Sequence, residues 1–311
     1  FAAETSCDET SICLMENSSI VKHITYSQEI HKIHGGVVPE LASRSHLEKI
    51  QIMTNELFSK GTIDPNEIDV FSATCGPGLI GSLLVGSNFT KSLAISFQKP
   101  FIPINHLEGH ILSTSFNNDI KFPSLVLLLT GGHTQVYLMK SGNEIELLGE
   151  SVDDAIGEAF DKTAKLIGLS YPGGREIEQQ ALDGNEDAFV LPKPLIKEKN
   201  FNFSFSGIKT HINLLTKKNK IDKKFIKDLS ASFQKNITEV LIEKLERGLG
   251  RLSTENKKIK SISVVGGVSN NKYIRSKIEN FFIKKNIEIY YPIKEMMGDN
   301  AAMIAWACMK F

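Results

Sequence analysis

The amino-acid sequence predicts an α/β protein with two lobes, on the evidence of three strand-and-turn patterns. Short polar residues between apolar stretches in residues 4–14 indicate two strands joined by a tight turn. The buried-strand run of residues 123–129 ends on Thr130-Gly131-Gly132, and a second strand-like segment follows. A β-branched strand over residues 261–265 ends on Gly266-Gly267 and leads into a helix.

Each of these turns can bring its backbone close to an anion. Glycine pairs let a phosphate or a ribose approach the chain, although a plain hairpin uses the same residues at its turn. A strand that ends on Gly-Gly before a helix marks the place where a nucleotide binds in an open α/β sheet. Together, the three segments match the nucleotide contacts of the two-lobed actin, Hsp70 and sugar-kinase (ASKHA) fold, which has duplicated RNase H-like lobes.

The elements of the first lobe follow from apolar spacing. After the first hairpin, apolar residues on one face predict a helix from Pro39 to Lys60. A strand over residues 68–73 and a helix over residues 79–97 come next. Gly81 and Gly86 weaken this second helix, so we expect it to pack closely on another backbone, within the lobe or in a partner chain.

The predicted boundaries assign residues 1–120 to lobe one, 121–297 to lobe two, and 298–311 to a segment that returns to lobe one. The returning segment carries Asp299 and a last helix over residues 300–309. Helices of lobe two are expected at residues 153–167, 175–183, 205–216, 222–250 and 271–285.

A histidine pair indicates a metal site. His106 and His110 stand four residues apart in a predicted helix over residues 106–116, so both imidazoles project from one face. Two histidines and one carboxylate, here Asp299, are a common ligand set for a divalent metal that keeps a position open for chemistry. Leu107 follows His106, which disfavours a zinc peptidase of the His-Glu-x-x-His type. Without a metal, the pair would be one buried and one exposed histidine.

Composition limits the compartment and the class of protein. The 311 residues carry equal numbers of basic and acidic side chains. The four cysteines form no Cys-x-x-Cys pair, which indicates neither a disulfide framework nor a thiolate zinc site and fits a reduced cytoplasm. No apolar run approaches the ~18 residues of a membrane helix, so we expect a cytoplasmic protein outside the membrane.

Long strings across the chain carry a family resemblance. They are Glu4–Thr10, His34–Arg44, Gly76–Leu79, His106–His110, Gly131–Gln135, Asp153–Thr163, Tyr171–Gly174, Phe203–Gly207, Gly266–Ser269 and Asp299-Asn300. On these strings, the sequence resembles the tRNA N6-adenosine threonylcarbamoyltransferase family of the bacterial TsaD type, formerly called O-sialoglycoprotein endopeptidase or glycoprotease. The resemblance spans essentially the whole chain.

The resemblance implies an acyl transfer. Threonylcarbamoyl-AMP would give its threonylcarbamoyl group to N6 of adenosine 37 in tRNAs that read codons beginning with A, the t6A modification, with release of AMP. One divalent metal per chain would be held by His106, His110 and Asp299; iron(II) is favoured, and zinc(II) also suits these ligands. The implied partners are tRNA and either a metal-less paralogue of the TsaB type with a P-loop ATPase of the TsaE type, or a second copy in a homodimer.

The same resemblance implies residue roles. Lobe two would bind the adenylate. Its phosphate and acyl part would meet Leu128, Leu129, Thr130, Gly131 and Gly132. Asp161 and Gly174 would meet the ribose and Asn271 the adenosine, and further candidates are Glu178, Gly266 and Gly267. Glu178 stands where many relatives have aspartate. Asp161 has the alternative of a helix-surface carboxylate. Asp8 and Glu9 are catalytic candidates for proton handling or substrate orientation, with a purely structural turn as the alternative.

Charge distribution suggests one more surface. Lys193–Lys227 holds ten lysines and two acids, whereas Ser141–Asp187 holds twelve acids and three basic residues. The lysine-rich stretch is either a solvated face or a surface that contacts tRNA phosphates.

Other activities would need different residues. A sugar-kinase-like ATPase shares the fold but would need a catalytic base and a sugar pocket, and has no use for His106 and His110. A scaffold paralogue would lack the metal residues. A metallopeptidase remains the historical alternative.

Overall fold

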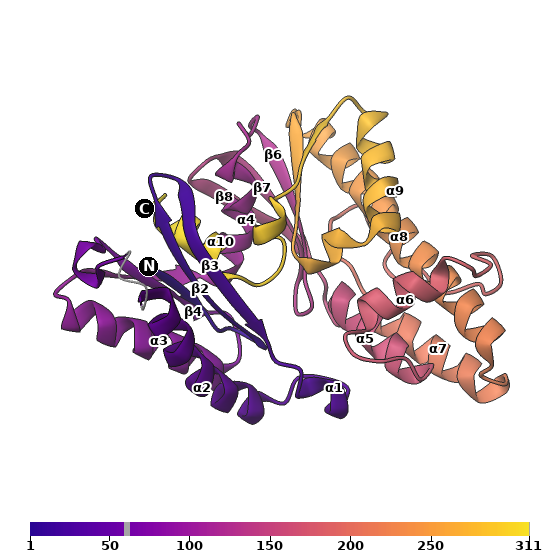
Figure 1. Ribbon diagram of the computed structural model, residues 1–311. Coiled ribbons are helices and arrows are strands. Elements are labelled where there is room, and N and C mark those ends of the chain that lie inside the picture. The colour runs from indigo at the N-terminus through magenta and orange to yellow at the C-terminus, as the bar shows by residue number, and fades with distance from the viewer. Residues whose placement is uncertain (59–62, 311) are drawn as a thin grey trace. The chain divides into compact units, whose positions relative to one another are not determined.

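The computed structural model describes residues 1–58 and 63–310 (Figure 1). The chain divides into two compact units. Unit 1 consists of Phe1–Asn118 with Pro292–Phe311, and unit 2 of Asp119–Tyr291. Within the described residues, no helix has both the length and the apolar character that a membrane span requires.

The two units contain sheets of the same topology. In unit 1 the order is β3-β2-β1-β4-β5, and in unit 2 it is β8-β7-β6-β9-β10. In each sheet the first three strands form an antiparallel meander, and the last two continue from the first strand in parallel. The strands are β1 (Ala2–Glu4), β2 (Glu9–Glu16), β3 (Ser19–Ser27), β4 (Phe71–Gly76), β5 (Phe101–Asn105), β6 (Ser124–Leu129), β7 (Thr134–Ser141), β8 (Glu144–Glu150), β9 (Ser261–Val265) and β10 (Glu288–Tyr290). This repetition confirms the predicted α/β fold with duplicated lobes.

Helices cover both faces of the unit 1 sheet. The helices are α1 (His31–His34), α2 (Pro39–Phe58), α3 (Ile80–Ser96), α4 (His106–Leu112) and α10 (Ala301–Cys308). Ile12 of β2 belongs to a core that includes Ile50 of α2 and Ala94 of α3. The neighbouring Ser11 accepts a hydrogen bond at Oγ from the backbone N–H of Ala301, at 2.9 Å. Because successive strand residues point to opposite faces, α10 lies on the face opposite to α2.

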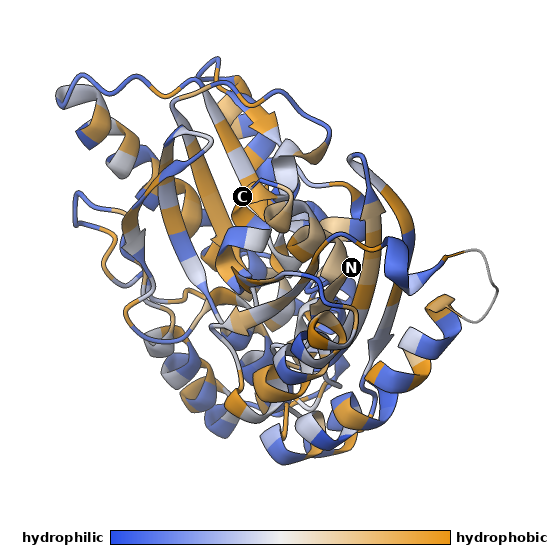
Figure 2. Ribbon diagram, turned by 90° about the vertical axis from the view of Figure 1, so that its left-hand side faces the viewer, coloured by the Kyte–Doolittle hydropathy of each residue, from blue (hydrophilic) through white to orange (hydrophobic). Residues whose placement is uncertain are grey.

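Unit 2 packs its helices into one core with its sheet. The helices are α5 (Ile156–Leu166), α6 (Gly173–Ala181), α7 (Ser206–Lys218), α8 (Lys223–Thr254) and α9 (Lys272–Ile283). Leu125, Leu127 and Leu129 of β6 share a buried cluster with residues from all five helices. Figure 2 shows the matching hydropathy pattern, in which strands are largely hydrophobic and helices alternate between hydrophobic and hydrophilic residues.

Several predicted boundaries are wrong for local reasons. The strand placed at residues 68–73 begins at Phe71, because Ile68 closes a 3-10 turn over Pro65–Glu67. The helix placed at residues 106–116 is α-helical only to Leu112 and ends as a 3-10 turn. The predicted end of the helix at Lys60 lies outside the described residues.

Helix α5 begins at Ile156 rather than at Asp153. The Asp153 carboxylate accepts hydrogen bonds from the backbone N–H groups of Phe205 and Ser206, at 2.8 and 3.2 Å, so it caps the start of α7 instead. A carboxylate engaged in this way fixes the chain before α5 in a non-helical course.

The glycines of α3 are used inside unit 1. A Cβ on Gly86 would collide with Thr5, and one on Gly81 would lie 3.2 Å from the Cβ of Ser43 in α2. Of the two alternatives, close packing within the lobe is therefore the one that the structure supports for both glycines.

Candidate metal and adenylate sites

His106 is the first residue of α4, which follows β5 directly. β5 ends at Asn105, whose side-chain Oδ1 accepts hydrogen bonds from the N–H groups of Leu107 and Glu108, at 2.8 and 3.4 Å. This N-cap starts the helix at His106 and satisfies two of its free donors. His106 and His110 are 5% and 0% exposed, and their rings meet edge to face with centroids 4.8 Å apart. The alternative of one buried and one exposed histidine is therefore wrong.

Asp299 completes a three-residue group. It stands just before α10, which Asn300 caps by accepting from Met303 N–H at 2.8 Å. Its Oδ1 lies 3.0 Å from Nε2 of His110 and 3.6 Å from Nε2 of His106. One ligand atom from each of the three residues lies within 4.8 Å of the others, so the group could hold a metal ion.

Glu4 faces Nδ1 of His106, the ring nitrogen on the side away from Asp299, a role that was not predicted from the sequence. Its carboxylate is fully buried, with Oε2 at 3.3 Å from His106 Nδ1 and Oε1 accepting from Ser6 N–H at 2.6 Å. Oε2 also accepts from the Thr74 hydroxyl. A carboxylate on one imidazole nitrogen orients the other nitrogen toward a metal and raises its basicity. The available signal was a glutamate inside an otherwise apolar strand, where burial of a charge requires a partner.

The charges of the site are mutually dependent. Burial opposes protonation of His106, but Asp299 and Glu4 outweigh it and raise the pKa of His106 to about 9. Burial also opposes ionisation of Glu4, and His106 outweighs that effect, so the pKa of Glu4 is lowered. At His110, burial dominates and lowers the pKa. Its Nδ1 is buried and has no hydrogen-bond partner among the described residues.

These observations fit a divalent cation. Two neutral imidazoles and one carboxylate match the donor types of zinc and of iron(II). The negative charges of Glu4 and Asp299 favour a positive charge at His106, and a bound cation would supply that charge instead.

Asp8 lies in the bend between β1 and β2, and Glu9 is the first residue of β2. Burial first, then the charges of Asp8 and Asp299, raise the pKa of Glu9 well above its ordinary value. His46 of α2 fixes this bend: its Nε2 lies 2.9 Å from the Cys7 carbonyl oxygen, and its Nδ1 lies 2.8 Å from Thr10 Oγ1. No local pattern in the sequence indicates this role of His46.

In unit 2, hydrogen bonds and packing against α5 hold one side of the Thr130–His133 turn, and its other side is open. The N–H of Thr130 donates to the His133 carbonyl at 2.9 Å, and the N–H of His133 donates to Thr130 Oγ1 at 2.9 Å. A Cβ on Gly157, at the start of α5, would lie 2.7 Å from the Cα of Gly131, so the helix packs directly against the turn. A Cβ on Gly131 or Gly132 would meet no atom within 4 Å. Their backbone is thus accessible to a ligand.

The ends of β6 and β9 meet beside this turn. Gly266 has φ 91°, and a Cβ there would collide with the Leu129 carbonyl, so only glycine permits this approach. Gly267 faces open space. Leu128 and Leu129 are 0% exposed as whole residues, so both lie beneath the surface of the turn, with neither side chain nor backbone open to a ligand.

The remaining candidates join helices to one another. Asp161 Oδ1 accepts from Gly173 N–H at 2.7 Å, at the start of α6, and Gly174 beside it faces open space. The interpretation of Asp161 as a plain surface carboxylate is therefore incomplete. Glu178 accepts from Lys272 N–H at 2.7 Å. Asn271 caps α9 through Ile274 N–H and donates from Nδ2 to Gln234 Oε1 at 2.8 Å.

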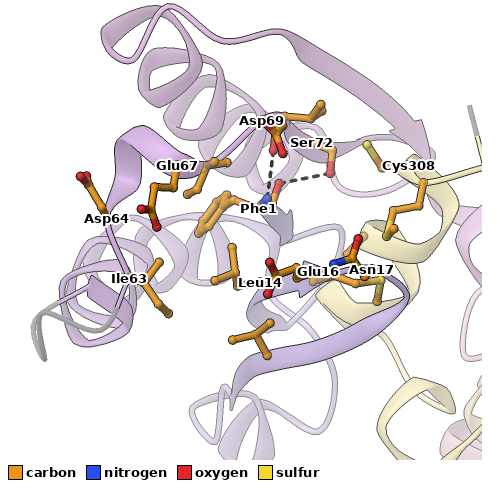
Figure 3. A pocket seen from close by; sticks show the side chains of 16 residues that line it. Phe1, Leu14, Glu16, Asn17, Ile63, Asp64, Glu67, Asp69, Ser72 and Cys308 are labelled. Carbon is orange, nitrogen blue, oxygen red and sulfur yellow. Dashed lines mark hydrogen bonds between the residues drawn. The ribbon is translucent and has the colours of Figure 1, made fainter.

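A separate cavity of 480 Å³ in unit 1 contains none of the predicted site residues. Figure 3 shows its lining, which includes Phe1, Leu14 and Ser72. The amine of Phe1 donates to the Val70 carbonyl at 2.9 Å. The catalytic candidates of unit 1 thus lie outside this cavity.

Comparison with known proteins identifies one family. The family model of tRNA N6-adenosine threonylcarbamoyltransferase, TsaD, matches residues 19–306. A relative of that name from Thermosipho africanus is 43% identical over 309 residues, which cover 99% of this chain and 92% of the relative. The relative from Wolbachia pipientis wMel is 40% identical over 306 residues, which cover 98% and 90%.

Solved structures agree at the level of the fold. Full-length HypF, in its phosphate- and nucleotide-bound form, is similar with a TM-score of 0.60 at 15% identity, over 99% of this chain and 46% of that chain. The activator of 2-hydroxyisocaproyl-CoA dehydratase from Clostridium difficile gives 0.53 at 15% identity, over 99% and 93%.

Proposed function

This chain belongs to the tRNA N6-adenosine threonylcarbamoyltransferase family, and we propose that it makes t6A at adenosine 37 of tRNAs that read codons beginning with A. In the reaction, N6 of adenosine attacks the carbamoyl carbon of threonylcarbamoyl-AMP. The bond from that carbon to the phosphate oxygen breaks, AMP leaves, and N6 loses one proton. The observation that carries the proposal is the group of two buried histidines, His106 and His110, with the partly exposed Asp299, and the Glu4 carboxylate on the other ring nitrogen of His106.

The metal would be held by His106, His110 and Asp299. We propose iron(II), with zinc(II) as the alternative that suits the same donors. When bound, the metal acts as a Lewis acid that polarises substrate oxygens. Glu4 keeps Nδ1 of His106 engaged, so that Nε2 is the nitrogen directed to the ligand group.

The proton of N6 requires an acceptor near neutral pH. Glu9 is our first candidate because burial and the charges of Asp8 and Asp299 raise its pKa, which makes its carboxylate a stronger base. Asp8, the neighbouring residue in the bend before β2, is the second candidate. His46 holds this bend through the Cys7 carbonyl, so it acts as a positioning residue for both acids.

Unit 2 would bind the adenylate. The open faces of Gly131, Gly132 and Gly267 leave room for the phosphate beside the ends of β6 and β9. Thr130 would contribute a contact from the turn, and the buried Leu128 and Leu129 would support that turn from β6. Asp161, Gly174 and Glu178 would meet the ribose, and Asn271 the adenosine.

A partner chain would cover α3. Ile80, Leu84 and Ile95 follow one stripe of that helix and are 77%, 54% and 70% exposed. Exposed large apolar side chains on one stripe are typical of an interface. We propose that this stripe binds a metal-less paralogue of the TsaB type, which acts with a TsaE-type ATPase; a homodimer through the same stripe is the alternative.

Loss of one metal ligand tests the function. His110→Ala should lose about one equivalent of metal and most of its transfer from threonylcarbamoyl-AMP to an unmodified tRNA, with the fold retained. His211→Ala, which changes a histidine of α7 that is not in the ligand group, is the matched control. Full transfer by metal-free His110→Ala protein would contradict the proposal.

A further inference from the structure

The end of α7 and the start of α8 form a lysine tip, defined as Lys217, Lys218, Lys220, Lys223 and Lys224. All five side chains are exposed, and they lie within eight consecutive residues, 217–224. The acid among them, Asp222, accepts from Phe225 N–H at 2.9 Å as the N-cap of α8. Figure 1 shows α7 and α8 in unit 2.

Two other lysines of the basic stretch already have acidic partners. Lys193 pairs with Glu239 and Glu243 at 3.0 and 3.1 Å, and Lys227 pairs with Asp183 at 2.8 Å. Acids of unit 2 therefore already neutralise those two lysines.

The tip lacks such partners. No described residue forms an ion pair with Lys217, Lys218, Lys220 or Lys223, and Lys224 reaches Asp228 only at the limiting distance of 4.0 Å. The positive charge of the tip is therefore available to an external anion.

Local stability does not explain the charges. Lys223 and Lys224 occupy the first turn of α8, where no acidic residue is present. Cations are unfavourable at the positive end of a helix dipole, and the neighbouring lysines repel one another. A bound polyanion would relieve both effects.

We propose that the lysine tip binds the phosphate backbone of the tRNA substrate, an inference that rests on the proposed function. Lysine ammonium groups act as point charges toward phosphates. Residues 217–224 contain no aromatic side chain on which a base could stack. The tip therefore contributes affinity that is independent of sequence, while recognition of adenosine belongs to the catalytic site.

Neutralisation of three lysines tests the inference. The tip variant Lys218→Gln, Lys220→Gln, Lys223→Gln is compared with a control, Lys258→Gln, Lys260→Gln, Lys284→Gln, which removes the same charge from other exposed positions of unit 2. Affinity of the full chain for an unmodified tRNA is measured between 0.05 and 0.2 M salt. The tip variant should bind about tenfold more weakly or worse, and its slope of log affinity against log salt should fall by roughly two to three. The control should change neither quantity by a comparable amount.

Three outcomes would overturn the inference: equal losses in both variants, wild-type affinity in the tip variant, or a tip variant that loses only its protein partner. If the tip variant retains wild-type tRNA affinity while the wild-type chain makes t6A, the lysine tip is not the tRNA-binding surface, and the proposed function is unaffected. If the tip variant loses tRNA affinity but the wild-type chain makes no t6A, the proposed function is wrong, and the assignment of the lysine tip as a tRNA-binding surface is retained.

Discussion

Replacement of Glu4 by Gln should weaken metal binding although Glu4 is not a metal ligand. The carboxylate lies 3.3 Å from His106 Nδ1 and also accepts from Ser6 and Thr74. Gln keeps the shape of the side chain but removes the charge that orients His106 and raises its basicity. Loss of such a partner behind a histidine ligand typically lowers metal affinity about 10- to 100-fold. The variant should therefore bind zinc more weakly by a factor in that range.

Competition with a chelator of known zinc affinity measures this effect. Glu16→Gln is the matched control, because it makes the same change at an exposed position on β2. In the metal-free protein, NMR titration should also show the pKa of His106 falling from about 9, since a carboxylate that raises it has been removed. Equal zinc affinity in wild type and Glu4→Gln, with an unchanged His106 titration, would refute this account of the site.

Three further predictions concern other parts of the molecule. Gly132→Val should weaken the binding of AMP or an adenylate analogue with little change in Tm. Gly142→Val, a control at another open position, should leave this binding intact. If calorimetry shows normal AMP binding by Gly132→Val, the Thr130–His133 segment is an ordinary hairpin turn. Burial lowers the pKa of His46 in the folded protein. Below about pH 6.5 the imidazole is therefore protonated more readily in the unfolded chain than in the folded protein, and the free energy of unfolding should fall as the pH drops. His46→Gln should reduce that slope by up to ~1.4 kcal/mol per pH unit in denaturant titrations, and an unchanged slope would contradict the prediction. Leu84→Arg should disrupt pairing through α3 and lower activity while retaining metal, as sedimentation would reveal; intact pairing would exclude this stripe.

Patterns within one segment were predictable from the sequence. The apolar run of β6 and the β-branched run of β9 revealed the central strands of unit 2, because strands buried in a parallel or mixed sheet are apolar throughout. The pairing of His106 with His110 followed from helical geometry. In contrast, β10 has three residues and β5 includes Pro103, so neither carries a distinct local signal.

Contacts between distant residues were not predictable. The role of Glu4 depends on His106, 102 positions away, and that of His46 on the Cys7 carbonyl, 39 positions away. The later start of α5 depends on Asp153 capping α7, which no pattern around Asp153 indicates. Glu9 and Asp299 likewise affect one another only because the fold brings α10 beside β2.

Mass spectrometry of tRNA nucleosides tests the central claim most directly. The chain would be incubated with unmodified tRNA, threonine, bicarbonate, ATP, the adenylate-forming enzyme and its partner proteins, alongside a tRNA with guanosine at position 37. We predict t6A in the first tRNA, one AMP released per t6A in transfer from threonylcarbamoyl-AMP, and no product in the second tRNA or with His110→Ala. Absence of t6A with metal-replete wild-type protein, or equal t6A without the chain, would contradict the account.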